Sequence, residues 1–177
     1  LNELSAVIPT SPYAVSKVTQ EALAQYYSNR GFEYIIVRPF NHIGPGQNPG
    51  FIVPDFAQQI VEGEKGNLSE ISVGNLEAKR DYTDVRDIVR AYRLLIESDA
   101  KNEIYNICSG NSVSGQEILD QLLIKSVANL AIKQVTEKMR PSDIPEIIGD
   151  YSKLNSATGW SPEYTLEQTL EDALTDW

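Results

Sequence analysis

The sequence has a single cysteine, Cys108, and a single histidine, His42. One cysteine cannot form an internal disulfide, and the pair falls short of the ligand set of a typical zinc site, so we expect no bound metal. No apolar run approaches the ~20 residues that a helix needs to cross a bilayer, and no secretory signal is visible. We therefore expect a cytoplasmic protein that makes no membrane contact.

Positive charge is also scarce. The 15 Lys and Arg residues against 25 Asp and Glu give a net charge of −10. Because no basic cluster stands out, binding to nucleic acid is not expected, and any anionic ligand must be held by a few local Arg or Lys side chains. Methionine occurs once, at Met139, and the sequence begins at Leu1. We therefore expect it to be a part of a longer translation product.

Helical and strand patterns alternate along the chain, which predicts the α/β class. Ser11-Pro12 begins a helical pattern that extends to about Asn29, and the apolar run 34–37 suits a buried strand. Residues 39–49 and 139–150 read as irregular. Further helices are expected at about 53–62, 84–98, 115–125, 152–158 and 166–176, and further strands at 71–73, 81–83, 103–107 and 131–135.

Tyr13 and Lys17 lie four residues apart on the first predicted helix, so their side chains project from one face. An ammonium group near a phenol favours the phenolate and lowers the pKa of the tyrosine from about 10. Such a tyrosine can donate or accept a proton near neutral pH. The pair alone is weak evidence, because a tyrosine beside a solvated lysine also arises by chance.

The context of the pair is more specific. The string 9–17, Pro-Thr-Ser-Pro-Tyr-Ala-Val-Ser-Lys, is followed by the strand and by Arg-Pro-Phe-Asn-His-Ile-Gly-Pro-Gly-Gln at 38–47. This closely resembles the active-site helix, next strand and substrate loop of extended short-chain dehydrogenases. Segments 74–87, 105–110 and 140–143 resemble those of GDP-mannose dehydratases and GDP-4-keto-6-deoxy-mannose reductases. The string 38–44 looks most like the reductases.

The resemblance implies an NAD(P)H-dependent oxidoreductase that acts on a nucleotide sugar. Tyr13 would protonate the C4 oxygen as hydride arrives from NADPH or NADH. Lys17 would lower the pKa of Tyr13 and hydrogen-bond the nicotinamide ribose. His42 would lie beside the cofactor, so Tyr13, Lys17 and His42 together form the expected cofactor site.

The resemblance also implies a set of substrate-binding residues. Asn41 would touch the sugar or the diphosphate. Arg80 and Arg140 would hold the diphosphate, because the guanidinium fork suits phosphate oxygens. Asp143 would accept hydrogen bonds from the nucleotide, through either its ribose or its guanine.

The fold implied is the C-terminal part of a Rossmann-type doubly wound parallel sheet plus a small α/β substrate-binding domain. Residues 1–50 would complete the dinucleotide-binding domain, and 51–177 would mainly bind substrate, with 81–107 returning to the Rossmann sheet. The helix that carries Tyr13 commonly pairs with its copy in a homodimer of this family. Candidates for that contact are Val18, Ala22 and Tyr26.

Other residues are expected to be structural. We expect Arg38, between a strand and a proline, to have a structural role. Cys108 should be a small buried filler rather than a nucleophile. We expect three arginines to lie on the solvent-exposed face of one helix: Arg86, Arg90 and Arg93.

The glycine-rich turn that cradles dinucleotide phosphates is absent from this sequence. The 177 residues alone should therefore be inactive. They should also expose an apolar face, which we expect an upstream segment or a partner to cover. The first hypothesis is a reductase of GDP-4-keto-6-deoxy-D-mannose that forms a GDP-6-deoxyhexose such as GDP-rhamnose. The alternatives are a GDP-mannose 4,6-dehydratase or nucleotide-sugar 4-epimerase, and a non-catalytic module that binds a nucleotide sugar.

Overall fold

A computed structural model describes residues 1–139 and 144–177 of the protein. Its helices are α1 (Pro12–Ser28), α2 (Ile52–Glu64), α3 (Val85–Glu97), α4 (Gly115–Ile124), α5 (Ser152–Thr158) and α6 (Leu166–Thr175), with a 3-10 helix at Thr136–Lys138. Its strands are β1 (Ile35–Pro39), β2 (Asn41–Ile43), β3 (Glu70–Val73), β4 (Lys79–Asp84), β5 (Glu103–Ile107), β6 (Ser112–Ser114), β7 (Ala131–Gln134) and β8 (Glu146–Ile147). The alternation confirms the α/β class.

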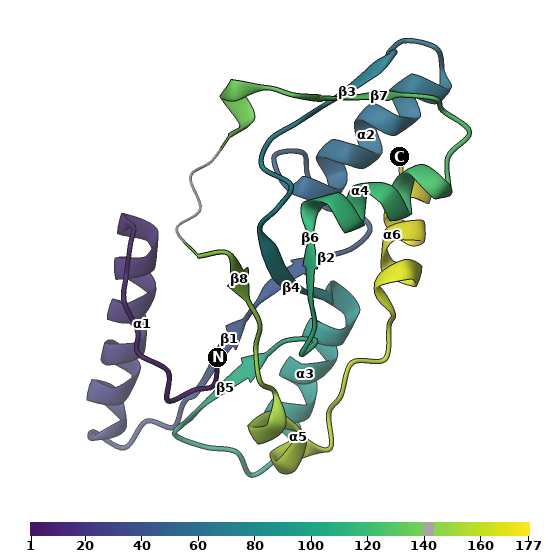
Figure 1. Cartoon of the computed structure of the whole chain (residues 1–177). Helices are drawn as coiled ribbons and strands as arrows, with labels where there is room; N and C mark the ends of the chain where they lie inside the picture. Colours follow the sequence, from purple (N-terminus) through teal and green to yellow (C-terminus); the bar gives the residue numbers. More distant parts are fainter. Residues whose placement is uncertain (140–143) are drawn as a thin grey trace.

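Most strand pairs join segments that are far apart in the sequence (Figure 1). β1 pairs with β5 in parallel, with Ile35 opposite Glu103, and β3 pairs with β7 in parallel. β4 pairs with three strands of a further sheet: β2 and β8 run parallel to it, and β6 runs antiparallel. These pairings connect the segment at 41–43 to segments in the second half of the chain.

Two clusters of buried apolar side chains hold the fold together. The α2–α4–α6 cluster joins those three helices to β3, and its buried members include Val53, Phe56, Ile60, Ile71, Val73, Ile118, Leu119, Leu122 and Leu170. The α3–β5 cluster lies beneath α5, and its buried members are Ile88, Ala91, Leu95, Tyr105, Ile107, Leu154 and Trp160. The amphipathic spacing of α3 explains why Ile88, Ala91 and Leu95 share one face.

Helix α1 differs from the other long helices because none of its residues is buried. Figure 1 shows it at the left of the molecule, apart from the other helices. Ser11 caps its first turn by accepting a hydrogen bond from the Ala14 backbone N–H at 3.1 Å, and Pro12 follows the cap. Of the expected dimer residues, Val18 is half-buried, whereas Ala22 and Tyr26 are exposed. Pairing through this helix stays a prediction.

The prediction of a solvated face was wrong for Arg90, because it pairs with a buried carboxylate. Arg90 Nη2 lies 2.6 Å from Asp87 Oδ1, and Asp87 is fully buried. The other oxygen of Asp87 accepts the backbone N–H groups of Glu163 and Tyr164 at 3.0 and 3.1 Å. A buried charge requires such partners, so the pair fastens the segment before α6 to α3.

Arg86 departs from that prediction in the same way. Its guanidinium donates to both carboxylate oxygens of the buried Asp84, at 2.8 and 2.7 Å, and Asp84 also accepts from the Thr169 hydroxyl at 2.7 Å. Burial raises the pKa of Asp84, but the hydrogen bonds from Arg86 and Thr169 outweigh it and hold the pKa below that of an ordinary aspartate. Arg93 fits the prediction, since its ion-pair partner among the described residues is the exposed Glu97.

Short strands were missed where the sequence carries no periodic signal. β2 lies inside the expected loop 39–49, and β8 lies inside the irregular stretch 139–150. Each has at most three residues and is defined by pairing with β4 rather than by its own pattern. Cys108 is buried as expected, and burial raises the pKa of its thiol to about 12.

Candidate active site

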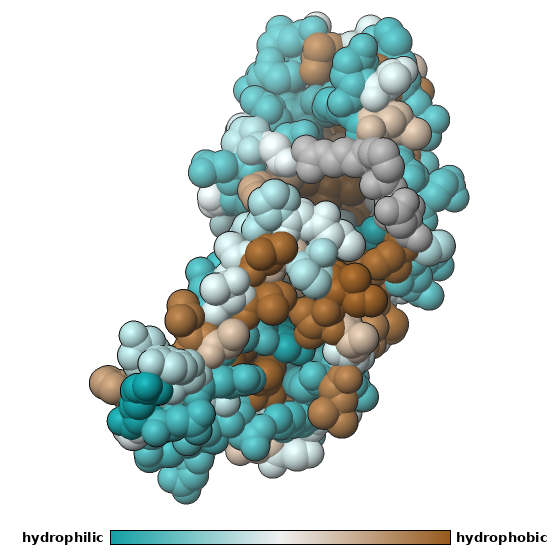
Figure 2. All heavy atoms as spheres, turned by 90° about the vertical axis from the view of Figure 1, so that its left-hand side faces the viewer, coloured by the Kyte–Doolittle hydropathy of each residue, from teal (hydrophilic) through white to brown (hydrophobic). Residues whose placement is uncertain are grey.

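A cavity of about 1100 Å³ opens between α1, the β1–β2 segment and β4. Figure 2 shows the side of the molecule on which α1 lies, and apolar side chains gather across the middle of this face. The apolar part of the cavity wall includes Val7, Ile8, Phe40, Phe51 and Ile147. A site of this size, with an apolar wall and a few polar groups, is typical of small-molecule binding.

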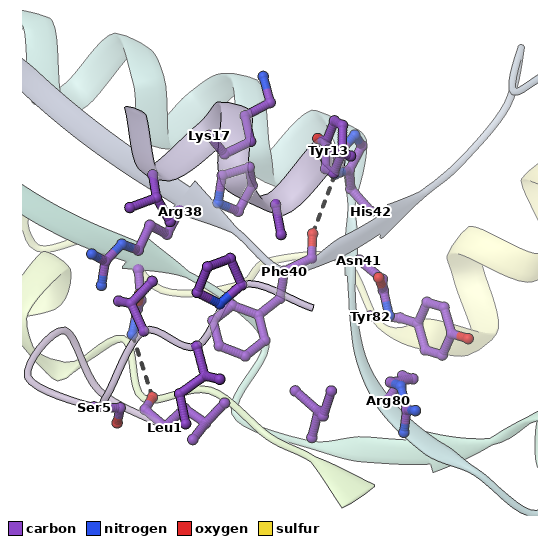
Figure 3. A pocket seen from close by; sticks show the side chains of 18 of the residues that line it. Leu1, Ser5, Tyr13, Lys17, Arg38, Phe40, Asn41, His42, Arg80 and Tyr82 are labelled. Carbon is purple, nitrogen blue, oxygen red and sulfur yellow. Dashed lines mark hydrogen bonds between the residues drawn. The ribbon is translucent and has the colours of Figure 1, made fainter. Parts of the chain in front are cut away.

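Tyr13 and Lys17 project from α1 on the wall of this cavity (Figure 3). The Lys17 ammonium lies 5.4 Å from the centroid of the Tyr13 ring and donates to the side chain of Gln20 at 3.4 Å. Tyr13 is 71% exposed, and its hydroxyl has no hydrogen-bond partner among the described residues. The phenol is therefore available to a ligand, and the Lys17 ammonium stands on the same wall.

Asn41 and His42 reach the cavity from β2, directly after the strand that ends at Pro39. Both side chains are exposed. The Nδ1 of His42 lies 3.3 Å from the backbone carbonyl of Phe40, and an Nδ1–H tautomer would donate to that oxygen. Pairing of β2 with β4 fixes the two residues in register, with Asn41 opposite Tyr82.

Arg80 and Tyr82 line the cavity from β4, where alternate residues face the same side. The guanidinium of Arg80 donates to the backbone carbonyl of Lys79 at 2.6 Å and to that of Pro145 at 3.5 Å. Burial raises the pKa of Tyr82, although the nearby charge of Arg80 opposes the shift. Two backbone carbonyls therefore hold the Arg80 guanidinium at the cavity wall.

Arg38 has the structural role that the sequence indicated. It donates to both carboxylate oxygens of Glu21 on α1, at 2.8 and 2.7 Å, and to the backbone carbonyl of Glu3 at 3.3 Å. The hydrogen bonds to Glu21 raise the pKa of Arg38. Because its charge is neutralised by Glu21, Arg38 ties α1 to β1 and leaves anion binding to other residues.

The structure brings most of the predicted site together. The residues expected from the sequence that line the cavity are Tyr13, Lys17, Asn41, His42 and Arg80. Arg140 and Asp143 lie outside the described residues. Among the described side chains, no group of His, Cys, Asp and Glu is placed to hold a metal ion.

Sequence reasoning missed Gln47 and the apolar wall. Gln47 lies on the cavity and ends the string Gly-Pro-Gly-Gln, which the resemblance already marked as a substrate loop. Phe40, Phe51 and Ile147 carried no signal, because an apolar residue beside a loop or at a strand end is indistinguishable from a core residue in sequence.

The Tyr-Lys helix, the Asn-His strand and the cavity between them define a protein of the extended short-chain dehydrogenase class. The chain belongs to the family whose model is described as GDP-mannose 4,6 dehydratase, which matches residues 1–173. None of the described helices is long and apolar enough to span a bilayer.

Relatives from two bacteria are similar to this chain. A GDP-6-deoxy-D-mannose reductase of Pseudomonas aeruginosa is 36% identical over 171 residues, which is 96% of this chain and 56% of the relative. A GDP-6-deoxy-D-talose 4-dehydrogenase of Aggregatibacter actinomycetemcomitans is 36% identical over 93% of this chain and 54% of its own length. The structure of RMD from Pseudomonas aeruginosa complexed with NADPH superposes with a TM-score of 0.93 at 35% identity.

These likenesses confirm the expected Rossmann-type α/β relationship. The superposition on the Pseudomonas structure covers 99% of this chain but 59% of that one, so the chain spans about half the length of its relatives. The division at residue 50, with 81–107 returning to the Rossmann sheet, stays a prediction.

Proposed function

We propose that the protein is a cytoplasmic NAD(P)H-dependent oxidoreductase that reduces the C4 ketone of GDP-4-keto-6-deoxy-D-mannose to a GDP-6-deoxyhexose of the GDP-rhamnose type. The observation that carries this proposal is the convergence of Tyr13, Lys17 and His42 with Asn41 and Arg80 on one cavity. The names of the two bacterial relatives support the GDP-6-deoxyhexose substrate class.

The residues present fit the nicotinamide end of NADP or NAD. Tyr13 offers a hydroxyl with no partner in the described part of the chain and Lys17 an exposed ammonium on the same wall, which suits the hydroxyl groups of a ribose. The NADPH in the similar Pseudomonas structure agrees with this cofactor class. When bound, the reduced nicotinamide supplies a hydride to the ketone carbon.

Tyr13 supplies the proton that completes the reduction. As the C4 carbon gains hydride, charge develops on its oxygen, and the Tyr13 hydroxyl donates its proton there to give an alcohol. The ammonium of Lys17 stabilises the phenolate left behind. A proton from solvent restores the phenol before the next turnover.

Arg80 holds the diphosphate, with Arg140 as the second cation that the sequence implies. Asn41 contacts the sugar or the diphosphate, and Asp143 accepts hydrogen bonds from the nucleotide. In a protein of net charge −10, local arginines are needed to hold an anion. We also propose a homodimer in which α1 packs against its copy, through the face that includes Val18, Ala22 and Tyr26.

The second candidate function is a GDP-mannose 4,6-dehydratase, which the description of the matching family favours. A nucleotide-sugar 4-epimerase uses the same Tyr-Lys chemistry. A non-catalytic binding module is the third candidate, because the glycine-rich phosphate cradle is absent from this sequence.

The test uses the full-length gene product. This protein is incubated with GDP-4-keto-6-deoxy-D-mannose and NADPH or NADH, and oxidation of the reduced nicotinamide is followed by absorbance. Rapid oxidation with formation of a GDP-6-deoxyhexose is the expected result. Conversion of GDP-mannose to its 4-keto-6-deoxy product would instead identify a dehydratase. Binding of GDP without turnover of either substrate would identify a binding module.

A further inference from the structure

Asp81 carries a buried carboxylate directly behind the cavity wall that β4 forms. Its neighbours Arg80 and Tyr82 line the cavity (Figure 3), whereas Asp81 is 1% exposed. Successive residues of a strand point to opposite faces, so this carboxylate lies on the side of β4 turned away from the cavity. Burial of a carboxylate is costly unless hydrogen-bond donors surround it. The donors around Asp81 therefore indicate what it holds in place.

Four hydrogen bonds converge on the Asp81 carboxylate, and they come from two distant segments. Its Oδ1 accepts from the backbone N–H and the hydroxyl of Ser109, at 2.8 and 2.7 Å. Its Oδ2 accepts from the backbone N–H groups of Gly110 and Gly149, at 3.0 and 3.1 Å. Hydrogen bonds to a charged acceptor are stronger than those between neutral groups. Asp81 therefore ties both the turn at 109–110 and the chain after β8 to the middle of β4.

The bond to Gly149 continues the attachment of β8 beyond its own pairing. β8 is two residues long and lies beside β4 (Figure 1), where its last residue, Ile147, is opposite Arg80. Strand pairing stops there, and the Asp81 side chain holds the chain two residues further on. Gly149 also packs so tightly that a Cβ would collide with the sulfur of Cys108. A strand of this length has few backbone hydrogen bonds, so its position depends on the tie to Asp81.

The strand held in this way contributes to the cavity beside Arg80. Ile147 lines the cavity. The carbonyl of Pro145, directly before β8, accepts from the Lys79 backbone N–H at 2.8 Å and from the Arg80 guanidinium at 3.5 Å. A shift of β8 would therefore move a wall residue and a partner of this guanidinium together.

We propose that Asp81 is a positioning residue for nucleotide-sugar binding, which acts by holding β8 against β4 beside the Arg80 guanidinium. The inference rests on the proposed function, in which Arg80 holds the diphosphate. The four hydrogen bonds to Asp81 involve neither α1, which carries Tyr13 and Lys17, nor β2. Asp81 therefore serves the binding of the sugar nucleotide, and neither the binding of nicotinamide nor proton transfer depends on it.

The first experiment compares Asp81→Asn with Asp87→Asn in the full-length gene product. Both carboxylates are buried and accept backbone N–H groups, so both variants lose stability, but Asp87 holds the segment before α6 and lies away from the cavity. Asp81→Asn should raise the KM for the nucleotide sugar about tenfold and leave kcat and the KM for NADPH within about twofold of the parent. Asp87→Asn should leave all three at the parent value. The same KM for the nucleotide sugar in both variants would overturn the proposal.

A milder variant covers the case in which Asp81→Asn does not fold. Ser109→Ala removes one of the four donors, and it should raise the KM for the nucleotide sugar about threefold. The control is Ser156→Ala, because that exposed hydroxyl donates within α5 to the carbonyl of Ser152. If Ser109→Ala keeps the KM of the parent, the proposal is wrong.

The second experiment asks whether Asp81 acts through Arg80. Arg80→Met should itself raise the KM for the nucleotide sugar, since it removes the guanidinium. Adding Asp81→Asn to that variant should raise the KM by less than about twofold, because the two residues then act on one interaction. A further tenfold rise would show that the effect of Asp81 bypasses Arg80 and would overturn this route.

Calorimetric titration with GDP-mannose separates this inference from the proposed function. If the parent protein binds GDP-mannose but shows no reductase turnover, Asp81→Asn should still weaken that binding about tenfold. Unweakened binding in Asp81→Asn would overturn the role of Asp81 alone, whichever reaction the protein performs. A parent protein that binds no nucleotide sugar would overturn both.

Discussion

Residues 1–42 and residues 43–177 of this chain differ in how they are held. The structure buries none of the side chains before Ile43, whereas two apolar clusters lie beyond it. The first region carries Tyr13 and Lys17, and both regions line the same cavity. The residues proposed for proton transfer therefore stand on the least buried part of the molecule.

Strand pairing joins the first region to the second, because β1 pairs with β5 and β2 with β4, and the half-buried Ile35 and Val37 pack against the α3–β5 cluster. Polar contacts add to this, since the Asn106 backbone N–H donates to Glu3 at 2.8 Å. The Asp150 backbone N–H donates to the Leu1 carbonyl at 2.8 Å. The comparison teaches that stability and proposed chemistry are carried by different residues, so substitutions should separate them.

The largest effect on stability is expected at Asp87 in the second region. Asp87→Ala leaves Arg90 and two backbone N–H groups without their buried carboxylate, so the free energy of unfolding should fall by about 3–5 kcal/mol. Urea unfolding measures it. Arg93→Ala on the same helix breaks only an exposed ion pair and should cost less than about 1 kcal/mol. Equal effects of the two variants would contradict the role of Asp87.

A smaller loss of stability is expected at Gly149, where the cavity wall meets β5. A Cβ there would lie 2.5 Å from Cys108 Sγ and 2.9 Å from the Phe40 ring. Gly149→Ala should therefore cost about 1–3 kcal/mol through overpacking, measured as a lower midpoint of thermal unfolding. Because Phe40 lines the cavity, ligand affinity should fall as well. An unchanged midpoint would show that this contact relaxes freely.

In the first region, Glu21→Ala removes the carboxylate that binds Arg38. We expect a loss of about 1 kcal/mol, because the pair is only partly buried and the helix contributes no core residue. Amide hydrogen exchange should become faster in α1 and stay unchanged in α2. Loss of protection across α2 would contradict the separation of the two regions.

The smallest effect concerns pH in the second region. The pKa of Asp84 is lowered in the folded state, so its carboxylate stabilises the fold above the pKa of an ordinary aspartate and the contribution is lost as pH falls through the folded pKa. Stability should therefore decline with acid below about pH 4, and Asp84→Asn should flatten that part of the profile. A variant whose acid profile matches the parent would exclude Asp84 as the source.

Sequence reasoning worked best where the signal was local. The cap at Ser11, the spacing of Tyr13 and Lys17, and the periodic helices were all predictable, because neighbouring residues determine them. The partners of Arg86 and Arg90 were missed, since whether Asp84 and Asp87 are buried depends on distant residues such as Thr169 and Trp160.

The cavity could be predicted only in part, for the same reason. The resemblance led to the polar residues, but the loop that places Gln47 on the cavity wall is held by the contact of Gly46 with Asp176, 130 residues away in sequence. No local pattern encodes that contact.

The central claim is that Tyr13 serves the reaction and not the fold, and Tyr13→Phe tests it most directly. The control is Tyr27→Phe, at an exposed tyrosine on the same helix. In the protein from its own gene, Tyr13→Phe should lower kcat about 10²–10⁴-fold while the free energy of unfolding stays within about 0.5 kcal/mol, and Tyr27→Phe should change neither. Parent-like turnover in Tyr13→Phe would contradict the account.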